Sequence, residues 1–235
     1  MWLMARYQPV GMFSLKSAMA TSSGGKSLLT PTPFALKMAL LDAAYRVYGA
    51  THVETLWPLL RDLPVAVDLA ERVVVTNLFA KVLKPRRGEA PAGTAHAGPL
   101  QKTIAFREYV WPAGEWGMAL ELPAALSSAQ GTALLLQLNY LGKRGSFIQL
   151  TGIPATVEAL PESYVRLNPP AGQTLFASQG VLQVLDDCGP KMTLEQANIY
   201  SGKNIRLGSE RVLHHIVLPY RQAQASKSYT LYERV

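Results

Sequence analysis

A long helix is predicted by the stretch Thr32-Pro33-Phe34-Ala35-Leu36-Lys37-Met38-Ala39-Leu40-Leu41-Asp42-Ala43-Ala44-Tyr45-Arg46-Val47-Tyr48-Gly49. Thr32 can cap the N-terminus of this helix, Pro33 is tolerated at its first position, and Gly49 can end it. Lys37 and Arg46 lie off the apolar stripe of the helix. Apolar residues recur at helical spacing and predict one buried face, which consists of Phe34, Met38, Leu41, Tyr45 and Tyr48.

Strand and loop patterns surround this helix. Residues 2–16 are typical of a strand, and residues 17–32 are typical of a loop rich in Ser, Thr and Gly. Residues 51–54 have capping-box spacing and begin a second helix, which Pro58 and Pro64 should keep short.

The rest of the chain has the pattern of antiparallel strands. The predicted elements are a strand at residues 72–83, a loop at 84–98, a hairpin of 101–111 with 115–122 across Pro112-Ala113-Gly114, and a closing pair of strands at 210–220 and 228–235 around a polar tip at 222–227. Helices and strands do not alternate regularly, which disfavours a doubly wound parallel sheet. The order predicts an α+β fold with a mainly antiparallel sheet and one long helix. We expect a single domain over residues 1–235, with C-terminal strands in residues 201–235.

Composition indicates a folded protein with an anionic partner. The chain is 49% hydrophobic and 17% charged, with a net charge of +7. Basic blocks at residues 1–46, 81–107 and 201–235 alternate with net acidic ones at 47–80 and 108–140. This alternation predicts that distant basic blocks fold into one basic face that binds nucleic acid.

The cysteine content and the hydropathy exclude several classes of protein. The single cysteine, Cys188, excludes an internal disulfide and a multi-cysteine zinc cage. A chain with one cysteine fits a reducing cytoplasm, where we expect the protein to be. No apolar run reaches the roughly 18 residues that a membrane-spanning helix needs, so we expect no membrane partner. We also expect no metal and no cofactor.

A glycine-flanked basic turn predicts phosphate contact. It reads Tyr140-Leu141-Gly142-Lys143-Arg144-Gly145-Ser146 and separates an apolar stretch from a strand-like run. The two glycines allow a tight turn and a close approach of the backbone to a ligand. Lys143 and Arg144 beside them can hold phosphate.

The densest group of basic and aromatic residues lies in and after the loop at residues 84–98. Cations that hold the backbone, and aromatic rings that stack on bases, are what single-stranded RNA requires. Residues expected to contact RNA here are Lys84, Arg86, Arg87, His96, Lys102, Arg107 and Tyr109. From the first basic block we add Lys16, Lys26, Lys37 and Arg46.

Two catalytic hypotheses remain open. Residues 20–27, Ala-Thr-Ser-Ser-Gly-Gly-Lys-Ser, fit a relaxed P-loop and would indicate a nucleotide hydrolase, although Pro31 and Pro33 follow where a helix should begin. Metal-independent cleavage of RNA needs a general acid and base, and His96 with Lys84 or Lys102 is the plausible local set. The adjacent pair His214-His215 points to opposite faces of a strand, so it is a poor metal site.

Three segments carry a resemblance to a known family. They are Leu29-Thr30-Pro31-Thr32-Pro33-Phe34-Ala35-Leu36-Lys37-Met38-Ala39-Leu40, Phe106-Arg107-Glu108-Tyr109-Val110 and Tyr140-Leu141-Gly142-Lys143-Arg144. They are similar to a Pro-Pro-Thr start of a Gly/Ala-rich first helix, an Arg-Glu-Tyr strand and a Leu-Gly-Arg-Arg turn. In order and spacing they resemble the RAMP superfamily of CRISPR-associated proteins, specifically the subunit that binds the 5′ handle of the guide RNA in Cascade-type complexes.

This resemblance implies a fold and a function. The fold would be a ferredoxin-like (RRM-like) RAMP core with an inserted β-hairpin thumb, whose natural place here is residues 81–102. The protein would bind the 5′ handle of CRISPR RNA and cap one end of a Cascade ribonucleoprotein complex in antiviral defence. Its partners would be a backbone RAMP subunit and a large subunit, with target DNA met indirectly. Some members cut precursor RNA with Tyr, Lys and His. No such triad matches here, so we expect a binder and not an enzyme.

Overall fold

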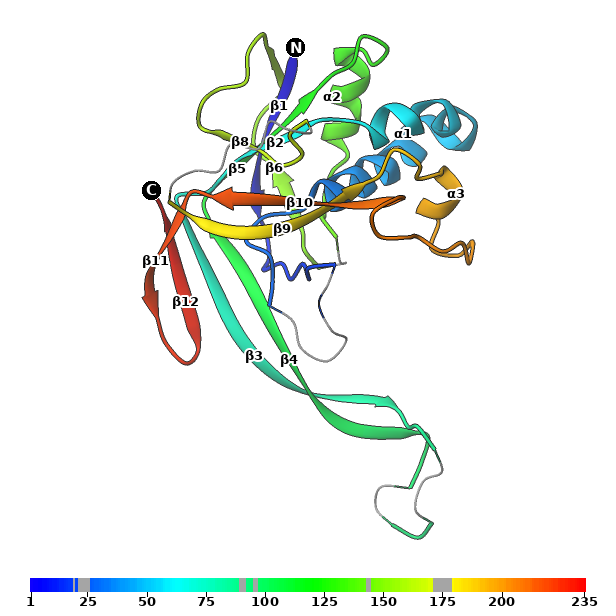
Figure 1. Cartoon of the computed structure of the whole chain (residues 1–235), viewed down its shortest axis with the longest axis vertical. Coiled ribbons are helices and arrows are strands. Elements are labelled where there is room, and N and C mark those ends of the chain that lie inside the picture. Colours follow the sequence, from blue (N-terminus) through cyan, green and yellow to red (C-terminus); the bar gives the residue numbers. More distant parts are fainter. Residues whose placement is uncertain (19, 21–25, 89–91, 95–96, 143–144, 171–178) are drawn as a thin grey trace.

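The computed structural model describes residues 1–235 except 19, 21–25, 89–91, 95–96, 143–144 and 171–178. It confirms the α+β class with mainly antiparallel sheets (Figure 1). None of the helices in the described parts of the chain is long and apolar enough to cross a membrane.

The core is an antiparallel sheet with two helices packed against it. Its strands lie in the order β6-β1-β5-β2. Once the long hairpin between β2 and β5 is set aside, the chain order is β-α-β-β-α-β, which is the ferredoxin-like arrangement. The core elements are β1 (Trp2–Pro9), α1 (Pro33–Arg61), β2 (Val65–Asp68), β5 (Trp116–Glu121), α2 (Ser128–Leu136) and β6 (Ile148–Leu150), extended by β7 (Ala155–Val157) and β8 (Tyr164–Arg166).

A second sheet and a strand pair are added to this core. The second sheet has the order β11-β12-β3-β4, and its strands are β3 (Arg72–Pro85), β4 (Leu100–Ala113), β11 (Tyr220–Ala225) and β12 (Tyr229–Arg234). A separate pair is formed by β9 (Val181–Cys188) and β10 (Arg211–Leu218), with the short helix α3 (Leu194–Ala197) between them. The far ends of β3 and β4 project from the body (Figure 1).

Two predicted strand pairings are wrong. Residues 101–111 do not pair with 115–122, because β4 pairs with β3 along its whole length and β5 pairs with β1 and β2. The predicted turn, with Gly114 at φ 95°, instead leads the chain from one sheet into the other. The predicted strand at residues 210–220 consists of β10 and, after Pro219, only the first residue of β11, which continues through the predicted polar tip to Ala225. β10 pairs with β9, and only β11 pairs with β12.

The N-terminal cap of α1 is confirmed. The Thr32 side chain accepts a hydrogen bond from the Ala35 N–H at 3.1 Å. Gly49 adopts φ 75° and interrupts the helical conformation where the sequence predicted an end. The second helical segment is longer than predicted, because it continues through Pro58 to Arg61. Its buried side chains, including Trp57 and Leu60, hold it on the core despite the lost backbone donor.

The predicted buried face of α1 is confirmed in part, since Leu41 is in the core and Phe34, Met38 and Tyr48 pack against it. Tyr45 is 44% exposed and only Leu41 of the five stripe residues is buried. The buried positions include Leu36, Leu40, Ala43 and Ala44, because the small alanines allow the helix to approach the core closely. The larger stripe residues lie at the margins of the helix. Phe34, for example, packs under the Arg211 guanidinium at 4.1 Å.

Lys37 is buried, in contrast to its predicted role as an exposed RNA contact. Its side chain is 1% exposed and its ammonium lies 2.7 Å from the Asp187 carboxylate on β9. The ammonium also donates to the Arg61 carbonyl at 2.6 Å. Asp187 accepts further hydrogen bonds from the Asn168 side chain and the Cys188 N–H. A lysine buried in this way cannot reach a phosphate. The helical spacing in the sequence could not predict this, because it does not show which residue lies opposite Lys37 in the core.

We expect Lys37→Met to lower the free energy of unfolding by about 3–5 kcal/mol, because it leaves the Asp187 carboxylate buried without its cation. Urea unfolding monitored by circular dichroism measures this change. The control Lys81→Met alters an exposed lysine on the hairpin and should cost less than about 0.5 kcal/mol. A loss below about 1 kcal/mol for Lys37→Met would show that the ion pair is open to solvent.

Candidate nucleic-acid interface

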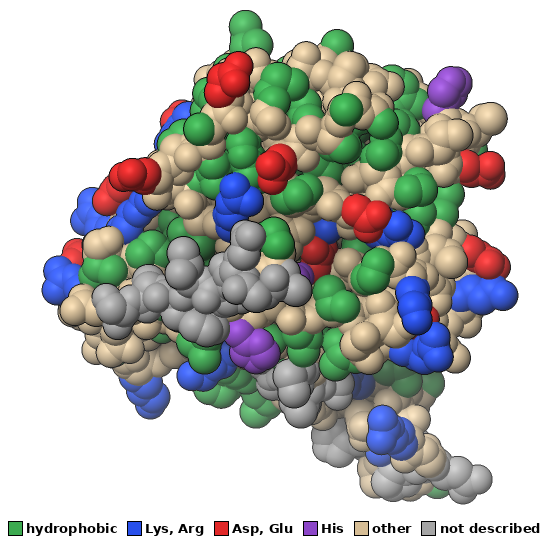
Figure 2. Space-filling model, turned by 45° about the horizontal axis from the view of Figure 1, so that its top comes forward, with side chains coloured by type: hydrophobic (Ala, Val, Ile, Leu, Met, Phe, Trp, Pro, Cys, Tyr) green, Lys and Arg blue, Asp and Glu red, His purple; other side chains and the backbone are tan. Residues whose placement is uncertain are grey.

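Many cations of the blocks that were predicted to form a single basic face are paired with acids. In the view of Figure 2, Lys and Arg side chains lie close to Asp and Glu side chains over most of the body. The Arg206–Glu210 contact of 2.7 Å illustrates the effect, since hydrogen bonds from Arg206 lower the pKa of Glu210 to about 2. The other pairs of the C-terminal block are Lys203–Glu195, Arg211–Asp186, Arg221–Glu233 and Arg234–Asp68.

The first basic block is divided in the same way. Arg46 is exposed but contacts Asp42 at 3.1 Å and donates to the Gln137 carbonyl at the end of α2. Lys37 is buried, as described above. Lys16 and Ser27 form a bridge, and the Ser27 N–H donates to Glu108 on β4 at 2.8 Å. The structure therefore places Lys16 and its bridge partner beside β4, and leaves Lys37 and Arg46 elsewhere.

The hairpin β3–β4 keeps its positive charge. Among the described residues, Lys81, Lys84, Lys102 and Arg107 make no ion pair. The strand register places Lys81 and Lys102 on one face of the hairpin, and Lys84 and Arg107 on the other. Arg86 lies at the end of the hairpin, where its N–H donates to the Pro99 carbonyl at 2.9 Å. The hairpin thus presents cations on both of its faces.

Apolar side chains on the same hairpin are also unburied. Phe79 is 69% exposed, Leu83 61% and Ile104 63%. They share the face of Lys81 and Lys102, and the Phe79 ring lies 5.0 Å from that of Phe106. Exposed apolar clusters of this kind indicate a surface that binds another molecule. These residues were not predicted from the sequence, because they share one face only when β3 is paired with β4.

An open groove of about 970 Å³ lies at the base of the hairpin. Its floor is the solvent-facing side of the β11-β12-β3-β4 sheet, opposite the side that carries the buried Val73, Val75 and Val110. This volume is within the range of ligand-binding sites. The groove is lined by Met12, Val74, Thr76, Asn77, Leu78, Tyr109, Gln224, Ser228, Tyr229 and Leu231.

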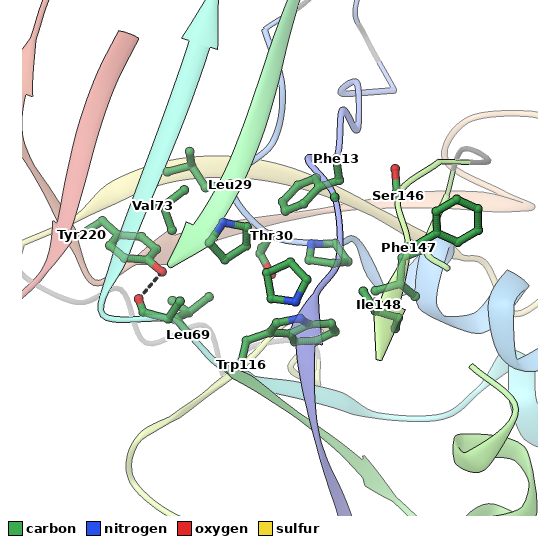
Figure 3. Close-up of a pocket in the computed structure, with 16 residues that line it drawn as sticks. Phe13, Leu29, Thr30, Leu69, Val73, Trp116, Ser146, Phe147, Ile148 and Tyr220 are labelled. Carbon is green, nitrogen blue, oxygen red and sulfur yellow. Dashed lines mark hydrogen bonds between the residues drawn. The ribbon is translucent and has the colours of Figure 1, made fainter. Parts of the chain in front are cut away.

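A second cavity lies beside the Gly-Lys-Arg turn (Figure 3). It is lined by Leu141, Ser146 and Phe147 of that segment, and by apolar residues that include Trp116. Its volume is only about 30 Å³, which is space for roughly one water molecule and too little for a nucleobase. The Tyr220 hydroxyl closes one side by donating to the Ala70 carbonyl at 2.6 Å. We therefore place the candidate interface at the hairpin and the groove.

The glycines of the predicted turn adopt the expected backbone. Gly142 has φ 72° and Gly145 has φ 99°, the left-handed region that favours glycine. A Cβ at Gly142 would meet the Leu15 side chain at 2.2 Å, so the turn approaches its neighbour closely. Lys143 and Arg144, the predicted phosphate contacts, lie outside the described residues.

The P-loop alternative lacks the helix that should begin at Lys26-Ser27. Ser27 is buried and accepts from the Leu15 N–H, and α1 begins only at Pro33, so Lys26-Ser27 does not start a helix. His96 lies outside the described residues. His214 is 3.8 Å from Asp187, and burial lowers its pKa, while His215 is exposed. Within the described residues no cluster of His, Cys, Asp or Glu could hold a metal ion.

Comparisons with known proteins find similarity only at the level of structure. No protein-family model matches the chain, and no curated protein matches it. A structure described as a CRISPR protein from Archaeoglobus fulgidus is 12% identical, with a TM-score of 0.48, over 100% of this chain and 92% of that one. A chain of a structure described as a CRISPR RNA-guided surveillance complex is 16% identical, with a TM-score of 0.45, over 100% of this chain and 89% of that one.

We expect the distal hairpin to be dispensable for folding. Beyond Thr76, β3 pairs only with β4, and the hairpin residues of the main core are Val73, Val75 and Val110 at its base. Joining Leu78 to Arg107 through Asn-Gly replaces the projection by a tight turn between two residues that already face each other. The free energy of unfolding, measured in urea, should change by less than about 1 kcal/mol. Loss of a cooperative transition would show that the projection belongs to the core.

Proposed function

We propose that this protein binds the 5′ handle of a CRISPR RNA and caps one end of a multi-subunit, RNA-guided complex. The observation that carries this proposal is the uneven neutralisation of charge. Most arginines of the body are paired with carboxylates, whereas Lys81, Lys84, Lys102 and Arg107 of the projecting hairpin have no acidic partner among the described residues. Unpaired cations on a projecting element suit a polyanion, because they attract phosphate without having to break an existing ion pair.

The shape of the hairpin suits contact with an RNA strand. From Leu78 to Pro85 it extends about 23 Å beyond the sheet, given the rise of an extended strand. Cations on both faces allow one strand of RNA to be held along it. Such binding uses phosphates and splayed bases, and it leaves the reading of target DNA to base pairing by the guide.

The apolar face of the hairpin supports a place within an assembly. Phe79, Leu83 and Ile104 are too exposed to stabilise this chain alone. We propose that they contact a neighbouring backbone RAMP subunit, as the thumb of the resembled family implies. A large subunit is the further partner in this proposal, and target DNA is met only through the complex.

We propose a binding role without cleavage. A ribonuclease would need an acid and a base beside the scissile phosphate. The histidine nearest to Asp187, His214, lies on β10, which pairs with β9 and with neither strand of the hairpin. The alternative set of His96 with Lys84 or Lys102 remains a prediction of the sequence.

We expect the triple change Lys81→Ala/Lys84→Ala/Lys102→Ala to weaken RNA binding and to flatten its salt dependence. Each phosphate contact to a single strand contributes a slope of about 0.7, so the slope of log K against log salt should fall by about 2. Filter binding across a salt series measures it. The matched control Lys191→Ala/Lys203→Ala/Arg166→Ala removes three exposed cations from the body and should leave the slope unchanged. Equal slopes for both variants would overturn the hairpin interface.

We further expect the assembled complex to prefer the repeat-derived handle. In a competition assay, a scrambled RNA of equal length should displace less of the bound labelled handle than unlabelled handle does, because splayed bases are recognised individually. The isolated chain serves as the comparison, since the groove and hairpin are present in it. Equal competition by both RNAs, for the chain and for the complex, would contradict handle recognition while leaving general RNA binding intact.

A further inference from the structure

Two tyrosines lie in register across the floor of the groove. Tyr109 on β4 is paired with Thr76 on β3, and Thr76 is paired with Tyr229 on β12. Residues paired directly across an antiparallel sheet share one face, so both rings stand on the groove side. Two strand spacings separate their Cα atoms by about 10 Å. The floor therefore offers two separate aromatic rings on one rigid platform.

Backbone hydrogen bonds hold this platform in place. The Asn77 N–H donates to the Ser228 carbonyl at 2.9 Å, and the Asn77 side chain donates to the Lys227 carbonyl at 3.2 Å. These bonds fix the turn before Tyr229 onto β3. The Thr76 hydroxyl donates to the Tyr109 carbonyl at 3.4 Å. Both tyrosines are thus held at their spacing before any ligand arrives.

The rim of the groove is polar, and two cations lie next to residues that line it. Gln224 and Ser228 line it with an amide and a hydroxyl, groups that can donate to or accept from the edge of a base. Arg107 lies on the same face, two residues before Tyr109, and the exposed Lys227 lies at the β11–β12 turn. The carboxylate on this face, Glu233, is already paired with Arg221 at 2.9 Å.

We propose that this groove is a base-stacking site, in which Tyr109 and Tyr229 each receive one unpaired base of a single-stranded RNA. The inference rests on the proposed RNA-binding function and adds a specific subsite to it. Planar rings, an amide and hydroxyl rim, and flanking cations together match the faces, edges and phosphates of splayed nucleotides. Arg107 continues the site into the hairpin, so the strand leaves the groove along the cations of β3–β4.

A protein occupant fits these observations less well. Strand addition by a peptide uses the edge of a sheet, whereas the tyrosines lie on its face. An apolar helix would leave Arg107 and Lys227 beside it without an anionic partner. RNA satisfies both cations through its phosphates, which is the reason we prefer it.

The test measures the binding of oligoadenylate that carries the fluorescent base 2-aminopurine, because stacking tolerates any base sequence. In the full-length protein, Tyr109→Ala or Tyr229→Ala should each weaken binding by about 5- to 150-fold. Tyr109→Phe and Tyr229→Phe keep the ring and should bind like the wild type. Loss of stacking should also abolish the quenching of 2-aminopurine, while the salt slope stays unchanged.

Three controls make the outcome decisive. Tyr200→Ala removes a tyrosine that is 90% exposed and outside the groove, and it should have no effect. Tyr109→Leu and Tyr229→Leu keep apolar bulk without a ring, and they replace the Ala variants if those do not fold. An oligoadenylate with abasic sites should bind as weakly to the wild type as the intact RNA binds to the Ala variants.

Contrary results separate the subsite from the general function. Wild-type affinity in the Ala variants, or Phe variants as weak as Ala, would overturn the stacking site. If the hairpin triple variant still flattens the salt slope in that case, RNA binding stands and only the groove fails. If the tyrosine variants leave RNA binding intact but release a copurified subunit, the groove is a protein site. Absence of RNA binding in the wild type would reject both.

Discussion

The buried ion pair between Lys37 and Asp187 links the core helix α1 to strand β9. Lys37 belongs to the first core helix, and Asp187 to β9, which follows the core in sequence. The pair also orders Asn168 and the last turn of α1 through the Arg61 carbonyl. In an apolar interior each charge is tolerated only because the other is present. The same environment raises the pKa of the adjacent Cys188 thiol to about 12 through burial, which keeps that thiol protonated and inert.

The distribution of surface charge follows from this arrangement of layers. Where the C-terminal strands meet the core, Arg234 of β12 pairs with Asp68 of β2, and within the added strand pair Arg211 of β10 pairs with Asp186 of β9. The hairpin projects beyond this contact region and therefore keeps its cations unpaired. Part of the formal net charge of +7 is therefore carried by hairpin lysines and Arg107 that have no ion-pair partner among the described residues. The groove at the hairpin base places two tyrosines beside that concentration, which gives the proposed interface both stacking and phosphate contacts.

Local signals in the sequence predicted local structure well. The capping residue Thr32, the break at Gly49, the left-handed glycines of the basic turn and the β-branched strand from Arg72 depend on neighbouring residues alone, and the structure confirms them. Pairing between strands was predicted poorly, because the turn at Pro112–Gly114 looks the same whether it closes a hairpin or links two sheets. The site was predicted in part. Arg107 and Tyr109 were identified from the basic and aromatic pattern, whereas Tyr229 and Phe79 were missed, because their faces depend on partners far away in the chain.

The sequence by itself determined the α+β class, the excess of basic residues and the position of the loop that carries many of them. These properties follow from composition, from the period of the apolar residues and from turn residues that act within a few positions. The tertiary structure alone decided which cations remain exposed and without an ion pair. Lys37 and Lys81 are the same residue type in basic blocks, yet one is closed against Asp187 and the other projects into solvent. The difference arises because burial and ion pairing depend on residues that are distant in the chain, such as positions 37 and 187. A local sequence pattern does not show which distant residues come into contact.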